Sequence, residues 1–351
     1  MKRALTITLL LVMGLLPAIP ASAEPMSKDH LSWQLSPTGT TAQLRGFSAV
    51  SRKVAWASGR LGTVLRTTDG GASWRQVSPP DTATLDFRDI EAFDADNAVI
   101  LSIGPGAQSR IYRTSDGGAH WTETFRNADA AAFYDCMAFF DRKRGLALSD
   151  PVDGKFRLLS TSDGGSSWTL LPNDGMPPAL TDEFAFAASG QCIRTTNHEA
   201  WIASGGGAQA RVYHSHDLGL HWTVSNTPLT SNGSSGVFAI DFRDPHRGIA
   251  VGGDFLAPTN GSHALARTRD GGRTWTEPST APAGYRSGVV FHPFFGTVAI
   301  AVGPSGSDVT LDGGQHWHQF DSGSFDTVTC TRDGACWASG EKGRVATLRL
   351  G

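Results

Sequence analysis

The chain has 351 residues, of which 41 are glycine and only 18 % are charged, and its formal net charge is −3. This balance carries no basic excess and gives no reason to expect nucleic acid as a partner. Abundant Gly, Trp, Thr and Ser, together with a lack of long amphipathic helical runs, predict many short strands joined by tight turns.

The N-terminal segment predicts export. Lys2 and Arg3 precede an apolar run over residues 5–16, and small residues suit cleavage after Ala23. That run is too short to span a bilayer comfortably, and no later stretch approaches the roughly 20 apolar residues of a membrane helix. We therefore expect residues 1–23 to be a signal peptide. Residues 24–351 are then a single periplasmic or secreted domain without a membrane span.

One turn pattern recurs along the chain. It runs from a Thr or Ser through Asp and Gly to a Trp five positions after the Asp, in six copies centred on Asp69, Asp116, Asp163, Asp217, Asp270 and Asp312, with Trp74, Trp121, Trp168, Trp222, Trp275 and Trp317. The carboxylate suits nearby backbone N–H groups, Gly supplies positive φ, and Trp anchors the turn. Calcium is a poor alternative, because one carboxylate per turn falls far short of six to eight oxygen ligands.

The repeat length predicts propeller blades. Successive Asp residues lie 42 to 54 positions apart, and a strand ending in small residues and Gly recurs in seven copies. The last copy, residues 324–350, has three strands and lacks the turn. Residues 31–36 around Trp33 match the strand that follows the first turn, so they should complete this blade and remove the exposed sheet edge. We predict an all-β, seven-bladed propeller of four-stranded blades.

The turn resembles the Asp-box, or bacterial neuraminidase repeat. The whole blade pattern, as in Phe47–Val50, Val54–Gly59 and Val64–Arg66 followed by the turn, most closely resembles the photosystem II stability and assembly-factor propellers of exported bacterial proteins. This resemblance implies a non-enzymatic binding or assembly-scaffold protein that recognises a protein or peptide partner in the cell envelope. It also leads one to expect an arginine patch.

Four cysteines in an exported chain allow three pairings. Cys330 and Cys336 lie on opposite arms of a predicted hairpin and should pair. Cys136 and Cys192 fall at the same level of adjacent predicted inner strands, so a bridge between blades three and four is expected if that register holds. No zinc-type cysteine spacing is present.

Binding residues are expected on the face opposite the repeated turns, where the loops vary. Aligned positions at the start of the inner strands hold Arg45, Arg88, Tyr134 and Arg286, and Asp150 and Asp254 lie in the neighbouring loops. Arginines there can clamp a carboxylate, a phosphate or an acidic segment. The alternative is that each arginine pairs with a neighbouring acid such as Asp89, Glu91 or Asp150 and ties the blades together.

A sialidase-like or other glycoside hydrolase or carbohydrate-binding propeller is the alternative function. Arg45, Arg88 and Arg286 with Tyr134 or Tyr285 and Asp150 form a similar residue set. Against it, the sialidase Phe/Tyr-Arg-Ile-Pro signature is replaced by Phe87-Arg88-Asp89-Ile90, and sialidase propellers have six blades. We expect no catalytic residues, no cofactor and no metal, and a monomer. The pairs His214 and His216, or His316 and His318, have the two-residue spacing of metal ligands, but solvated imidazoles are the simpler expectation.

Overall fold

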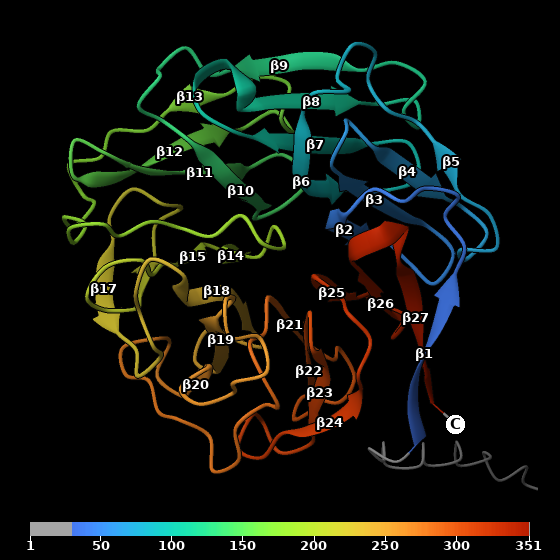
Figure 1. Ribbon diagram of the computed structural model, residues 1–351. Helices are drawn as coiled ribbons and strands as arrows, with labels where there is room; N and C mark the ends of the chain where they lie inside the picture. Colours follow the sequence, from blue (N-terminus) through green and yellow to red (C-terminus); the bar gives the residue numbers. More distant parts are fainter. Residues whose placement is uncertain (1–29, 351) are drawn as a thin grey trace, which may run out of the picture.

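The computed structural model describes residues 30–350, so the expected signal peptide lies outside the described residues. Seven sheets stand around a central axis as the blades of a propeller (Figure 1). Apart from His30 at the start of the described part, helix is limited there to two short 3-10 turns, η2 (Gly106–Gln108) and η3 (Glu341–Gly343). None of the described helices is long and apolar enough to cross a membrane. The predicted all-β, seven-bladed fold is confirmed.

Each blade is an antiparallel sheet whose first strand lies nearest the axis. Blades 1 to 3 comprise β2 (Leu44–Ala49), β3 (Ala55–Gly59), β4 (Val64–Thr67) and β5 (Arg75–Gln76); β6 (Asp86–Ala92), β7 (Ala98–Ile103), β8 (Arg110–Thr114) and β9 (Thr122–Arg126); and β10 (Tyr134–Phe139), β11 (Gly145–Val152), β12 (Lys155–Thr161) and β13 (Thr169–Leu170).

Blades 4 to 6 follow the same order. They comprise β14 (Ile193–Thr196), β15 (Glu199–Ala203), β16 (Arg211–Ser215) and β17 (Thr223–Asn226); β18 (Ser235–Phe242), β19 (Gly248–Asp254) and β20 (Leu265–Thr268); and β21 (Gly288–Phe291), β22 (Ala299–Gly303), β23 (Gly306–Thr310) and β24 (His318–Asp321). Blade 5 differs from the prediction, because its sheet has three strands and its outer position holds only an isolated bridge between Arg267 and Thr276.

Blade 7 joins the two ends of the described chain. Its strands β25 (Thr327–Cys330), β26 (Cys336–Ser339) and β27 (Val345–Leu350) are completed on the outside by β1 (Leu31–Ser36). β1 pairs with β27 in antiparallel register, with Trp33 opposite Leu348. The predicted closure is confirmed, and it removes the sheet edge that blade 7 would otherwise expose.

The hydrophobic core lies between neighbouring blades. All five residues of β3 are buried, since each sheet is covered on both faces by the sheets beside it. Trp56 of blade 1 packs edge-on against Trp121 of blade 2 at a centroid distance of 6.3 Å. The same cluster contains Val64 and Phe87, again from both blades. Stability therefore comes from a ring of inter-blade contacts.

The six repeated turns share one hydrogen-bond pattern. In blade 5 the hydroxyl of Thr268 accepts the N–H of Gly272 at 2.9 Å and donates to the carboxylate of Asp270 at 2.8 Å. That carboxylate also accepts the N–H of Thr274 at 3.0 Å. Desolvation raises the pKa of Asp270, but the hydrogen bonds together outweigh it and lower the pKa to about 2. The carboxylate is therefore used inside the turn. The buried Thr or Ser before the Asp is thus as much part of the turn as the Asp.

Both predicted disulfides are present. Cys136 of β10 is bonded to Cys192, the residue before β14, with a Cα–Cα distance of 6.1 Å. This bridge joins blades 3 and 4. Cys330 and Cys336 close the hairpin between β25 and β26.

Candidate functional site

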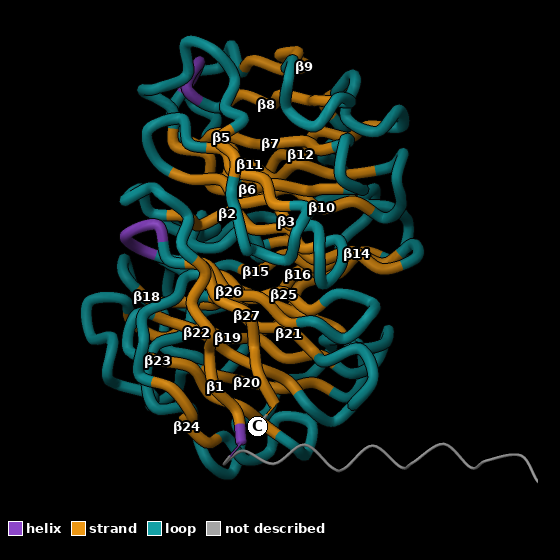
Figure 2. The backbone as a smooth tube through the Cα atoms, turned by 90° about the vertical axis from the view of Figure 1, so that its right-hand side faces the viewer, coloured by secondary structure: helices purple, strands orange, loops and turns teal. Residues whose placement is uncertain are grey.

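The ring has two unlike faces. The repeat-turn face carries the six turns together with the first connection of each blade, as the hydrogen bond from the Gly70 N–H to the Lys53 carbonyl shows. The opposite face, here called the variable face, carries η2, η3 and the segments that lead into the inner strands. Figure 1 looks onto the variable face, and Figure 2 shows it edge-on with both 3-10 turns on one side.

A segment of blade 4, residues 184–191, extends across the axis at the variable face (Figure 1). We call it the crossing segment. The N–H of its Ala185 donates to the carboxylate of Asp150 at 2.8 Å. At its far end the Gln191 amide donates to the carbonyls of Val289 at 3.2 Å and Val328 at 3.0 Å, in blades 6 and 7. The segment therefore ties four blades together across the channel, and the predicted binding residue Asp150 helps to hold it.

Arg45 and Arg88 lie beside this segment and remain partly open to solvent. Their side chains are 24 % and 16 % exposed. Arg88 donates to the carboxylate of Asp86 at 2.9 Å and to the carbonyl of Ala187 at 2.9 Å. Burial lowers the pKa of Arg88, and the nearby charge of Arg45 lowers it further. The two guanidinium groups are thus like charges near one another, and each also has an acidic neighbour, Asp326 for Arg45 and Asp86 for Arg88.

Arg45 has hydrogen-bonding capacity left over. Its nearest acid is Asp326, at 3.8 Å from Nε, which is beyond hydrogen-bond distance. One carboxylate oxygen of Asp326 is already bonded to the Gln43 amide at 2.9 Å. Among the residues that the structure describes, the buried Nε of Arg45 has no hydrogen-bond partner. A buried donor without a partner is unfavourable. Because this Nε is closed to solvent, the part of Arg45 that a ligand can reach is the exposed part of its side chain, which is 24 % exposed.

The side chains of Tyr134 and Arg286 are buried, unlike those of Arg45 and Arg88. A bulge in β2 and β6 leaves Arg45 and Arg88 unpaired between Leu44 and Gly46, and between Phe87 and Asp89. In β10 the bulge residue is Asp135, so Tyr134 corresponds to Leu44 and Phe87 and is buried like them. Because a shift of one residue turns a side chain to the other face of its strand, the predicted alignment misplaced Tyr134 by one position.

Arg286 is enclosed within blade 6. Its side chain is 0 % exposed, and its Nε donates to the carboxylate of Asp308 at 2.6 Å. A second nitrogen donates to the hydroxyl of Ser305 at 2.9 Å. Arg286 is thus paired with an acid, as the alternative expected, but the acid belongs to the same blade, so this pair does not tie two blades together. Asp254 likewise serves its own loop, because its carboxylate accepts the N–H of Leu256 at 2.9 Å.

Asp135 and Asp150 form a buried carboxyl pair below the crossing segment. Burial raises the pKa of Asp135 well above its ordinary value, and the negative charge of Asp150 adds to this effect. Burial also raises the pKa of Asp150 to about 6. The charge of each carboxyl acts on the other, and Oδ2 of Asp135 has no hydrogen-bond partner within the described residues. A proton on one of them relieves the repulsion of two buried anions.

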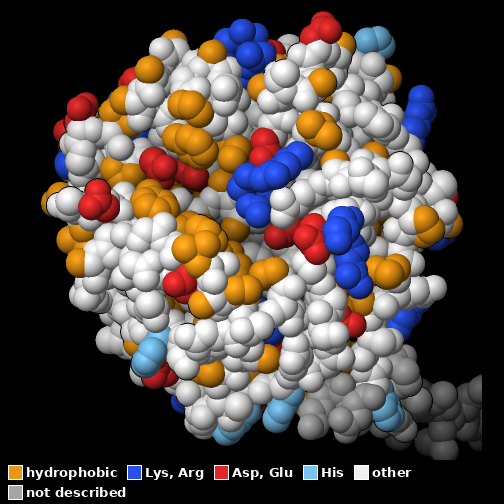
Figure 3. Space-filling model, in the orientation of Figure 1, with side chains coloured by type: hydrophobic (Ala, Val, Ile, Leu, Met, Phe, Trp, Pro, Cys, Tyr) orange, Lys and Arg blue, Asp and Glu red, His pale blue; other side chains and the backbone are white. Residues whose placement is uncertain are grey.

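An aromatic tract lies next to the arginines, and sequence reasoning missed it. It consists of Phe184, Phe186, Phe238, Phe255 and Tyr285. Phe186 stacks on Phe238 with ring centroids 3.7 Å apart, and Phe255 and Leu256 at its outer end are exposed. Figure 3 shows basic side chains near the centre of the variable face beside a tract of hydrophobic side chains. Phe184 and Phe186 lie outside every strand pattern, so only the crossing segment brings them to this tract.

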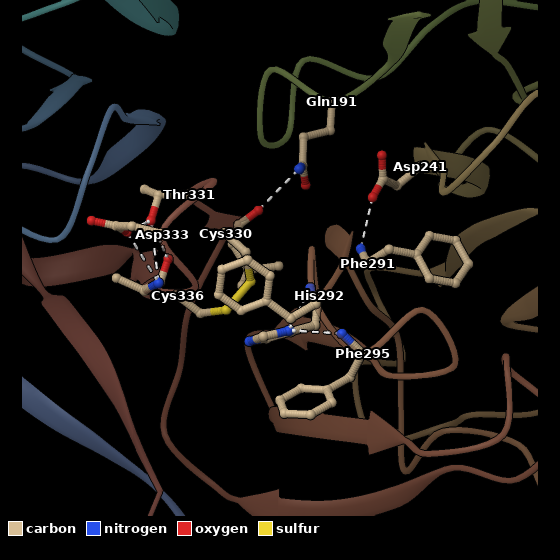
Figure 4. The surroundings of a disulfide bond; sticks show 12 residues. Gln191, Asp241, Phe291, His292, Phe295, Cys330, Thr331, Asp333 and Cys336 are labelled. Atoms are coloured by element: carbon tan, nitrogen blue, oxygen red, sulfur yellow. Dashed lines mark hydrogen bonds between the residues drawn. A yellow bond between two sulfur atoms is a disulfide. The ribbon is translucent and has the colours of Figure 1, made fainter. Parts of the chain in front are cut away.

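A cavity of about 640 Å³ follows the axis on the other side of the crossing segment. Residues 189–191 line it at one end, and the ends of the inner strands line it toward the repeat-turn face. Its walls include Asp89, Glu91 and Asp241, and Arg194 binds Asp241 at 2.8 Å. Burial raises the pKa of Glu91 to about 7. Figure 4 shows Gln191, Asp241 and the Cys330–Cys336 disulfide around this part of the cavity.

Comparisons with known proteins support the fold. No protein-family profile and no curated protein sequence matches the chain. Among solved structures, the chain is similar to YCF48 bound to D1 peptide, with a TM-score of 0.63 and 17 % identity over 94 % of this chain and 98 % of that one. It is also similar to YCF48 from Cyanidioschyzon merolae, with a TM-score of 0.61 and 16 % identity over 90 % and 98 %. A GH74 enzyme of Niastella koreensis gives a TM-score of 0.60 and 14 % identity, over 89 % of this chain and 53 % of that one.

Proposed function

We propose that this propeller binds an acidic segment of a partner protein on its variable face, with Arg45 and Arg88 holding a carboxylate and the aromatic tract holding apolar side chains beside it. The observation that carries this proposal is the unused hydrogen-bonding capacity of Arg45, 3.8 Å from its nearest acid and next to a second, partly open arginine. A guanidinium fork matches a carboxylate in geometry as well as charge.

Two further observations support a peptide as the ligand. The aromatic tract is adjacent to the arginines through the crossing segment, since Arg88 binds the carbonyl of Ala187, next to Phe186. An extended chain that places a carboxylate on Arg45 can therefore also contact Phe255 and Leu256, which are exposed. The similarity to YCF48 bound to D1 peptide makes peptide recognition by this fold a known possibility.

The resemblance of the repeat turns to Asp-boxes supports a more specific assignment of family and location. We infer that the chain is an Asp-box propeller of the assembly-factor type, that it is exported to the periplasm or beyond, and that its partner lies in the cell envelope. The N-terminal residues support export, and the pair of disulfides fits an oxidising compartment.

The test is binding of a peptide library in which each acidic member has a matched amide member, with Glu replaced by Gln and Asp by Asn. Wild type should prefer acidic, aromatic-containing peptides, and Arg45→Gln with Arg88→Gln should remove that preference. Arg243→Gln is the matched control, because Arg243 is an exposed arginine on the opposite face that binds the Gly296 carbonyl. Equal binding of acidic and amide peptides, or equal loss in the control, would overturn the proposal.

Glycoside hydrolysis is the alternative, and the similarity to a GH74 enzyme is the observation in its favour. Two glycosidase carboxyls must lie at least about 5 Å apart to flank a sugar. Asp135 is buried, and the carboxylate of Asp150 is bonded to the N–H of Ala185 in the crossing segment, so this pair does not present two open carboxyls to a sugar. Hydrolysis of a glycoside panel that is lost on changing Tyr134 or Asp150 would nevertheless move the assignment to an enzyme.

A further inference from the structure

Three metal-ligating side chains converge at the repeat-turn end of blade 4, away from the proposed peptide site. Glu199, His214 and His216 each offer one ligand atom, and these three atoms lie within 4.8 Å of one another. One carboxylate oxygen of Glu199 lies 2.5 Å from Nε2 of His214 and 2.7 Å from Nδ1 of His216. Within the described residues, this is the one group of three or more such donors that meets.

The strand register explains why they meet. β15 and β16 pair with Ala200 opposite Ser215 and Trp201 opposite His214. His214 and His216 are two residues apart, so their side chains point to the same side of the strand. Glu199 lies at the start of β15 and faces the same way as Trp201. The strand register therefore brings the three side chains together. The spacing of the histidines in the sequence indicated His214 and His216 but not Glu199.

The surroundings fix one ligand and leave another accessible. The ring of His214 is buried and stacks on Trp201 at 4.7 Å between centroids. Trp201 is held in turn by a hydrogen bond from its indole to the Gly271 carbonyl at 3.0 Å and by stacking on Phe242 at 3.8 Å. His216 is 57 % exposed, so a metal can enter from solvent. A preorganised ligand with packing behind it favours metal binding.

We propose that Glu199, His214 and His216 bind a divalent transition-metal ion of the Zn²⁺ class, with a fourth coordination position open to solvent. Two imidazole nitrogens and one carboxylate oxygen are a ligand set that Zn²⁺ takes in proteins, at about 2.0–2.2 Å from each ligand. The metal replaces the two short contacts that His214 and His216 now make with one oxygen of Glu199. Ca²⁺ and Mg²⁺ prefer all-oxygen ligands and do not fit this set.

The experiment is titration of the untagged chain with Zn²⁺ at pH 7.5 by calorimetry, with Ca²⁺ as the negative control. Wild type should bind one Zn²⁺ per chain and unfold at a higher temperature with it, since a ligand that binds only the folded state stabilises that state. His216→Ala and Glu199→Gln should each weaken binding by at least about tenfold.

The matched control is His221→Ala. His221 is an exposed histidine of the same blade that pairs with Asp217 alone, at 2.6 Å. Its replacement should leave Zn²⁺ binding unchanged. The proposal is wrong if wild type shows no saturable binding of one Zn²⁺, if His216→Ala and Glu199→Gln both bind as wild type does, or if His221→Ala loses as much as His216→Ala.

Discussion

The indole N–H of Trp33 donates a hydrogen bond to the hydroxyl of Ser307 at 2.9 Å, across a sequence separation of 274 residues. Trp33 is in the strand that completes blade 7, and Ser307 is a buried residue of blade 6. The ring of Trp33 also packs on Phe325 at 5.3 Å. The closing strand is therefore bound to two blades, in the way that the tryptophans of the repeat turns contact neighbouring blades.

Trp33→Phe should lower the free energy of unfolding by about 1 kcal/mol, because it removes one hydrogen bond and keeps an aromatic ring. Urea unfolding measures this change. Trp168→Phe is the control, since Trp168 is also half-buried and its Nε1 has no partner within the described part of the chain. If Trp168→Phe destabilises as strongly as Trp33→Phe, the hydrogen bond is not the cause.

The threonine or serine that opens each repeat turn should be as important as its Asp. Thr268→Val keeps the shape of the side chain but leaves the N–H of Gly272 without its acceptor, so we expect a loss of about 1–3 kcal/mol in unfolding free energy. Thr276→Val, on an exposed position, should change stability by less than about 0.5 kcal/mol. Equal effects at the two sites would show that the turn does not depend on this hydroxyl.

The two disulfides should contribute unequally to stability. Cys136 and Cys192 are 56 positions apart in the sequence, whereas Cys330 and Cys336 are 6 positions apart. Closing the longer loop restricts the unfolded chain more, which gives about 4 kcal/mol against about 2 kcal/mol. Urea unfolding of the two double-alanine variants should therefore show the larger loss for Cys136→Ala with Cys192→Ala. The reverse order would contradict the loop argument.

Repetition explains how far the sequence predicts this structure. The blade count, the closing strand at Trp33 and the Cys136–Cys192 bridge all follow from aligning equivalent positions of the repeat, and all three are confirmed. Alignment fails where the inner strands bulge, because one extra residue reverses the side that a side chain faces. Arg88 is thus the bulge residue of β6 and partly open, whereas Tyr134 precedes the bulge of β10 and is buried.

The crossing segment could not be predicted from the repeat. Its Gln191 binds the carbonyls of Val289 and Val328, which are 98 and 137 residues away. No local pattern marks such contacts, because their partners are backbone groups that any residue can supply. The aromatic tract depends on the same segment through Phe184 and Phe186, so sequence reasoning found the arginines and missed the surface beside them.

The axial cavity should make stability depend on pH through Glu91. Burial raises the pKa of Glu91 from 4.5 to about 7, so the folded chain holds this proton more tightly than the unfolded chain. Between these two values the unfolded state releases the proton first, and the stability of wild type must fall as the pH rises. Glu91→Gln removes this fall. It should be more stable than wild type by about 1–2 kcal/mol above pH 7, a figure reduced for solvent screening in the cavity.

Unfolding free energies of wild type and Glu91→Gln across this pH range measure the effect, and their difference should shrink toward low pH. Glu123→Gln is a control of opposite sign, because the hydrogen bond from Arg126 lowers the pKa of Glu123. That variant should lose stability at neutral pH, and its loss should shrink as acid protonates Glu123 in wild type. A Glu91→Gln difference that does not change with pH would show that Glu91 ionises in the folded chain as freely as in the unfolded one.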